Sequence, residues 1–243
     1  RKHLRLPIAE RWFPEPVRLE KSAGMHRFVW DLRYASSGAT DAEDASDEST
    51  VPKGPRVQPG VYHLKLTVDG QAQTQSIAVK MDPRSSATAA GLADQYRDAI
   101  EIYQSTMLSR QSLSEVKSVQ KQLDNISAQA ASNPELLARV TVLHGALQKI
   151  LDGEKGSATM GLNSANSGIA SALKVVEGGD RSIPESALEV YRISKAAFEV
   201  RAAEWQRLKT SDLVQLNHEL ENSGLAPVKM AEIEQEIEYL MTR

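Results

Sequence analysis

The chain contains no cysteine, which excludes disulfide bonds, thiolate metal ligands and a cysteine nucleophile. Aromatic residues make up only 5% of its 243 residues, and the second half is dominated by Ala, Leu, Glu, Gln and Lys. No run of about 18 apolar residues occurs, so no transmembrane helix is predicted. The formal net charge of -3 gives no overall attraction for nucleic acid or an anionic membrane. What is left is an ordinary globular chain, long enough for one large domain or two small ones.

Residues 24–34, with the sequence GMHRFVWDLRY, alternate between apolar and charged side chains. With Val29 as the one exception, the two faces are Phe28, Trp30 and Leu32 against Arg27, Asp31 and Arg33. A period of two with aromatic residues predicts a half-buried β-strand. We expect its apolar face to form the core of a small β domain, and its charged face to lie outside or against the helices.

A β-hairpin is predicted over residues 58–81. Residues 61–68 alternate, and Asp69-Gly70 is a two-residue turn sequence of the kind that requires positive φ. Residues 71–81 then return as the partner strand, which Asp82-Pro83 ends. Together with residues 24–34, the hairpin predicts a structural core of Phe28, Trp30, Leu32, Tyr62, Leu64 and Leu66.

Two other N-terminal segments lack the pattern of a central strand. Residues 1–23 contain three prolines and predict an extended edge segment. Within it, Trp12 and Phe13 are expected to cover the sheet, with carbohydrate contact as the alternative. Residues 35–56 include the acidic run DAEDASDE and predict a mobile loop. Calcium binding is the alternative there, but the loop lacks the spaced ligands and central glycine of an EF-hand.

From Gly91 onwards the apolar residues recur every three or four positions, which predicts amphipathic helices. The expected helices cover about residues 90–131, 134–152, 161–177, 184–223 and 229–242. Asn133-Pro134 is a helix start and Gly153 a helix stop. The short connections predict an antiparallel four-helix bundle over residues 85–243, after a β domain over residues 1–84. The fold class is therefore α+β with two domains, and the last helix is expected to pack on the bundle or on another chain.

No set of residues in the sequence forms a convincing active site. A Gly-x-Ser-x-Gly elbow is absent, and Gly153–Gly161 does not fit a phosphate-binding loop. Carboxylates are plentiful, but their number alone does not indicate a glycosidase. No metal-ligand spacing relates the five histidines, which are His3, His26, His63, His144 and His218. We therefore predict no catalytic residue, no cofactor, no metal site and no nucleic-acid partner.

Four sequence blocks resemble the C-terminal region of large bacterial BNR/sortilin-like repeat proteins, often labelled glycosyl hydrolases of the BNR or xyloglucanase-like type. They are GMHRFVWDLRY at 24–34, QPGVY at 58–62, LTVDG at 66–70 and VKMDPR at 79–84. Residues 212–227 are similar to the end of that family's helical region. The resemblance implies an immunoglobulin-like or FlgD-like antiparallel β-sandwich followed by a helical bundle, in a periplasmic or extracellular protein.

In that family the repeats form an N-terminal β-propeller, where any glycosidase-like site would lie, and no propeller repeat occurs in this chain. Because the chain begins at Arg1 rather than at Met, we expect it to be a fragment or a processed product, with the sandwich completed by upstream strands. The expected function is a non-catalytic accessory or assembly module that packs against the propeller or mediates protein contact, including self-association through the helices. The alternatives are a carbohydrate-binding module and part of a glycoside hydrolase substrate site.

Overall fold

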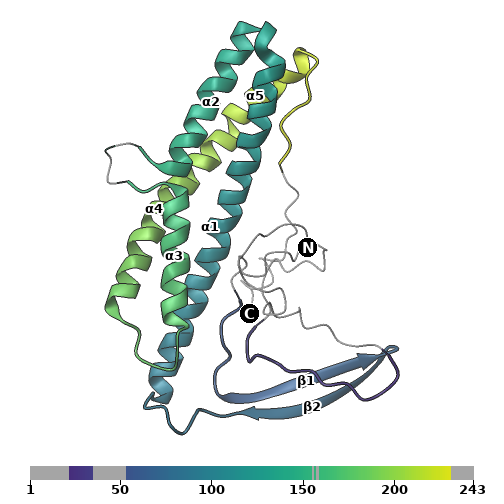
Figure 1. Cartoon of the computed structure of the whole chain (residues 1–243), viewed down its shortest axis with the longest axis vertical. Helices are drawn as coiled ribbons and strands as arrows, with labels where there is room; N and C mark the ends of the chain where they lie inside the picture. Colours follow the sequence, from purple (N-terminus) through teal and green to yellow (C-terminus); the bar gives the residue numbers. More distant parts are fainter. Residues whose placement is uncertain (1–21, 35–52, 155, 157–158, 231–243) are drawn as a thin grey trace, which may run out of the picture.

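The computed structural model describes residues 22–34, 53–154, 156 and 159–230. In that part of the chain a β-hairpin lies at one end of a long helical bundle (Figure 1). The hairpin precedes all of the helices in the sequence, and α1 starts beside it. The model is therefore mostly helical, with four helices packed together and one two-stranded antiparallel sheet.

The hairpin consists of β1 (Gly60–Val68) and β2 (Gln71–Val79), in a register that places Tyr62 opposite Ile77 and Val68 opposite Gln71. Asp69 and Gly70 form the turn with φ of 48° and 79°. Positive φ at both central positions defines the turn that matches the twist of the flanking strands. The predicted hairpin and its turn are thus confirmed.

Helix α1 (Ala89–Gln129) is capped by the Thr88 hydroxyl, which accepts a hydrogen bond from the Gly91 N–H. A short 3-10 turn, η3 (Ala130–Ser132), follows it, and α2 (Pro134–Asp152) begins at the predicted Asn133 cap. Asn133 accepts from the Leu136 N–H, and Gly153 ends the helix with φ of 81°. The local start and stop signals therefore place both ends of α2 correctly.

The remaining helices are α3 (Leu162–Val176), α4 (Glu185–Thr210) and α5 (Asp212–Asn222). The single helix expected over 184–223 is divided at Ser211, whose φ and ψ are -116° and -70°. Short polar side chains such as Ser211 and Asp212 compete with helical hydrogen bonding, which accounts for the break. The helix expected over 229–242 lies almost wholly outside the described residues.

Residues 153–161 connect α2 and α3. The two ends of this connection are held together by backbone and side-chain contacts. Gly153 pairs with Met160 in an isolated antiparallel bridge. The buried Arg201 side chain of α4 donates from Nε to the Met160 carbonyl at 3.1 Å and pairs with Glu204. Helices α2 and α3 lie one after the other along α1 (Figure 1).

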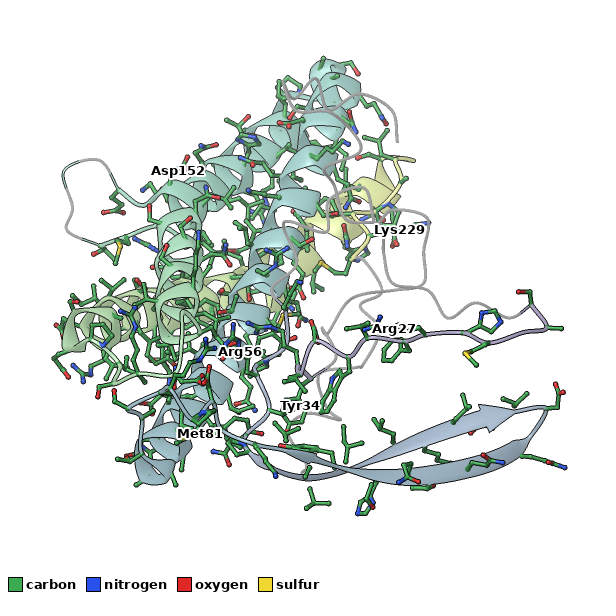
Figure 2. The ribbon with its side chains drawn as sticks, turned by 60° about the horizontal axis from the view of Figure 1, so that its bottom comes forward. Arg27, Tyr34, Arg56, Met81, Asp152 and Lys229 are labelled. Atoms are coloured by element: carbon green, nitrogen blue, oxygen red, sulfur yellow. The ribbon has the colours of Figure 1, made fainter. Side chains whose placement is uncertain are left out.

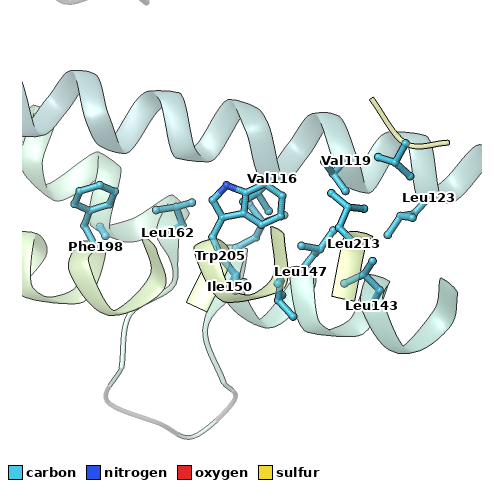
Figure 3. Close-up of a cluster of buried hydrophobic side chains, with 14 of the residues drawn as sticks. Val116, Val119, Leu123, Leu143, Leu147, Ile150, Leu162, Phe198, Trp205 and Leu213 are labelled. Carbon is cyan, nitrogen blue, oxygen red and sulfur yellow. The ribbon is translucent and has the colours of Figure 1, made fainter. Parts of the chain in front are cut away.

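The hydrophobic core lies in the bundle, where side chains of all five α-helices meet (Figure 3). The stripes predicted on α2 and α3 are buried throughout. The largest fully buried side chain is Trp205 of α4. The hairpin lies outside this core, and residues 80–88 connect β2 to the start of α1.

The described residues show no β-sandwich, and this corrects the prediction for the N-terminal domain. Residues 24–31 form no strand; the only pairing in this segment is a bridge between Arg33 and Arg56. Four of the predicted core residues are exposed: Phe28 by 56%, Leu32 by 42%, Leu64 by 45% and Leu66 by 58%. Trp30 and Tyr62 are partly buried. Among the described residues no second sheet covers the hairpin, and its apolar face is left largely exposed apart from the contact of Tyr62 with Trp30.

Candidate interaction surface

The apolar residues of the hairpin gather on one face of β1. Residue pairs that lie opposite each other share a face, so Tyr62, Leu64, Leu66 and Val68 stand beside Ile77, Gln75, Gln73 and Gln71. β2 is therefore polar on this face except near its end, at Ile77 and Val79. We call Tyr62, Leu64, Leu66 and Val68 the β1 apolar face.

Residues 22–34 run alongside the hairpin (Figure 2). The Trp30 and Tyr62 rings meet edge to face, with centroids 5.5 Å apart. The Trp30 indole donates to the Arg33 carbonyl at 2.9 Å, and the Tyr62 hydroxyl donates to the Gln58 carbonyl at 2.7 Å. Desolvation raises the pKa of the Tyr62 phenol. Both aromatic side chains thus direct their polar groups to the protein itself.

A cluster of polar contacts joins the β region to the bundle. The Arg33 guanidinium pairs with Glu177 and donates to the Gly54 carbonyl at 2.9 Å. The Tyr96 hydroxyl donates to the Tyr34 hydroxyl at 2.8 Å, and burial raises the pKa of Tyr96. Arg33 therefore contacts the helices, as predicted for the charged face of residues 24–34.

The cavity at this junction is small, at about 140 Å³, and its lining mixes Leu32, Val57 and Leu92 with charged groups such as Glu177. Pockets for drug-sized ligands are roughly 300–1,000 Å³. The Gln95 amide spans the same region and donates to the carbonyls of Val176 and Gly179. We interpret the junction as a structural contact rather than a ligand site.

Within the bundle, the side chain of Glu115 is 8% exposed. It accepts from the Trp205 indole at 2.8 Å, from Lys209 at 3.1 Å and from Gln111 at 3.1 Å. Burial by itself raises the pKa of this carboxyl, but the three hydrogen bonds outweigh it and hold the pKa below its ordinary value. The burial of Glu115 was not predicted from the sequence, because its partners Trp205 and Lys209 come from another helix.

Glu115→Gln should lower stability at neutral pH by about 1–2 kcal/mol, because charge-assisted hydrogen bonds are lost. The folded pKa lies below that of an unfolded chain, near 4.3. The stabilisation is therefore complete above that pH and is lost as the pH falls through the folded pKa. Urea titrations of both proteins should show the difference shrinking on acidification. A difference that stays constant with pH would contradict the assignment.

No group of three or more His, Asp or Glu side chains in the described ranges is arranged to hold a metal ion. Trp12, Phe13 and the acidic run at 41–48 lie outside those ranges, so carbohydrate contact and calcium binding there stay predictions. None of the described helices combines the length and apolar composition needed to cross a lipid bilayer.

Comparison of the chain with protein-family models, with curated proteins and with solved structures gave no match. The most distinctive property of the surface is that large apolar side chains are exposed together on a sheet that has two strands in the described part of the chain.

Proposed function

We propose that this chain is a non-catalytic assembly module, whose hairpin packs against a β-rich partner through the β1 apolar face. The observation that carries the proposal is the exposure of Leu64, Leu66 and Val68, by 45%, 58% and 57%. Contiguous exposed apolar groups mark interaction surfaces in soluble proteins. An isolated two-stranded hairpin is also marginally stable in water, so a covering partner would stabilise it.

The resemblance to BNR/sortilin-like repeat proteins supports a particular partner, the β-propeller of such a protein. In this proposal the module follows the propeller in an exported polypeptide and packs on it in the periplasm or outside the cell. The segment beside the hairpin is joined to the bundle through the pairing of Arg33 with Glu177.

The test uses the propeller of the parent protein, produced as a separate polypeptide, and measures its binding to this chain by calorimetry. Leu64→Ser with Leu66→Ser should weaken binding at least tenfold, or about 1.4 kcal/mol. Val61→Ser with Thr67→Ser is the matched control, since both residues lie on the opposite face of β1.

Equal losses in the two double variants would contradict the β1 apolar face, and no binding by the unmodified chain would contradict the propeller as partner. Light scattering tests the form of the proposal in which copies of the chain associate with each other. A strict monomer at high concentration would rule out that form.

Carbohydrate binding is the second candidate, because Phe28 is exposed beside Trp30 and aromatic rings stack on sugars. Two contacts weigh against it: Trp30 packs on Tyr62 and donates its indole N–H to Arg33. Titration with soluble oligosaccharides decides the matter, and absence of heat or of a fluorescence change would remove this candidate.

A further inference from the structure

The outer edge of β1 carries backbone groups without a partner in the described part of the chain. A two-residue turn makes Val68 and Gln71 a hydrogen-bonded pair, and such pairs alternate along the hairpin. The N–H and C=O groups of Val61, His63 and Lys65 therefore point away from β2. No backbone hydrogen bond joins them to a described residue outside the hairpin. Such an edge is a template for another strand.

A short antiparallel pairing lies just before β1 in the sequence. The Tyr34 N–H donates to the Pro55 carbonyl at 3.0 Å, and the Val57 N–H donates to the Leu32 carbonyl at 2.9 Å. Residues 32–34 are thus antiparallel to residues 55–57, which lead directly into β1. Val57 belongs to the same alternating set as Val61 and His63. The bridge therefore lies on the edge that continues as the free edge of β1.

The segment leaves this edge at Leu32, which has φ of 60°. A leucine in this left-handed region is strained, and in sheets the conformation occurs where one extra residue forms a bulge. A bulge at Leu32 shifts the pairing by one residue, so each side chain before it moves to the opposite face of the sheet. Without one, the register of the bridge would place Phe28 and Trp30 on the face of His63 and Lys65. With one, they join the β1 apolar face, where Trp30 already contacts Tyr62.

We propose that residues 24–31 close onto the free edge of β1 as a third antiparallel strand, with Leu32 as the bulge. Closure pairs the open backbone groups of Val61 and His63 with those of Arg27 and Met25. It places Phe28 opposite Gly60 and Trp30 opposite Gln58, on the same side of a three-stranded sheet as the β1 apolar face. The binding of a partner to this face rests on the proposed function. The formation of the third strand does not depend on that function.

The test measures hydrogen exchange of the backbone amides by NMR in the intact chain. The N–H groups of Val61 and His63, which would pair with Arg27 and Met25, should exchange at least tenfold more slowly than those of an open edge. Two proline variants test which backbone N–H groups of the proposed strand point toward β1. With the bulge, the Arg27 N–H points toward β1 and the His26 N–H points away from it. Arg27→Pro should therefore abolish the protection, whereas His26→Pro, the matched control, should leave it within about threefold.

Fast exchange at Val61 and His63 in the unmodified chain, with slow exchange at the residues bonded to β2, would overturn the third strand. Loss of protection in His26→Pro but not in Arg27→Pro would overturn the bulge and the assignment of faces. Unchanged far-ultraviolet circular dichroism in both variants checks that the bundle is intact. Protected edge amides without any binding of the propeller would reject the proposed function and leave the third strand standing.

Discussion

Replacing Trp205 by alanine should destabilise the protein by about 3–5 kcal/mol, the usual cost of deleting a large buried aromatic side chain. Trp205 is 1% exposed and packs between Val116 of α1 and Ile150 of α2 (Figure 3). Its removal leaves a cavity, takes a hydrogen bond from the buried Glu115 and removes the ring beneath Lys209. Since whole domains are stable by only about 5–15 kcal/mol, urea unfolding followed by circular dichroism should show a much lower midpoint.

Two further variants separate the contributions of volume and of hydrogen bonding. Trp205→Phe keeps most of the ring but removes the indole N–H, so it should fall between the native chain and Trp205→Ala. Val200→Ala, on the same helix but 49% exposed, should change stability by less than about 0.5 kcal/mol. A Trp205→Ala effect no larger than that of Val200→Ala would show that Trp205 is not part of the core.

Gly161→Ala should cost about 3 kcal/mol by overpacking the base of the connection between α2 and α3. A Cβ at Gly161 would lie 2.3 Å from the carbonyl carbon of Asp152 and 2.4 Å from the Gly153 nitrogen. Both are backbone atoms, so the clash can be relieved only by opening the bridge between Gly153 and Met160. Differential scanning calorimetry should report a lower melting temperature.

Gly145→Ala is the matched control for this substitution. Gly145 lies within α2, where an added Cβ would meet nothing within 4 Å. Alanine at an exposed helical glycine removes a propensity cost of about 1 kcal/mol, so this variant should be stabilised. Opposite signs for the two variants are expected, and equal effects would contradict the close approach at Gly161.

The helical region was well predicted because its signals are local. The spacing of Val140, Leu143 and Leu147 defines a buried stripe within a single helix, and Asn133-Pro134 defines its start without reference to any other element. The hairpin was predicted for the same reason, since Asp69-Gly70 specifies its own turn. The break at Ser211 was missed because apolar periodicity continues across it.

The sandwich and its core were not predictable in the same way. Alternation in residues 24–34 shows which side chains share a face, but a strand also requires a partner for its backbone groups. Among the described residues of this segment, only the Leu32 carbonyl and the Tyr34 N–H find such a partner, on either side of the bridge between Arg33 and Arg56. The alternation did identify the surface: Phe28, Leu64 and Leu66, predicted as core, are the exposed apolar residues on which the candidate interaction surface depends.

The buried carboxylate of Glu115 shows a different limit of sequence reasoning. Its partners Trp205 and Lys209 come from α4, far away in the sequence. Sequence spacing can place Glu115 on the buried side of α1, but only the packing of α4 decides which donors reach it. Long-range polar contacts of this kind follow from the fold rather than from any local pattern.

Helix α1 also determines a distance. Its 41 residues, at 1.5 Å each, make a rod about 60 Å long that begins beside the hairpin. The pairing of Arg33 with Glu177 joins residues 22–34, which run beside the hairpin, to the end of α3. A molecule held near the start of α1 and another held at the far tip of the bundle would thus be separated by about 60 Å.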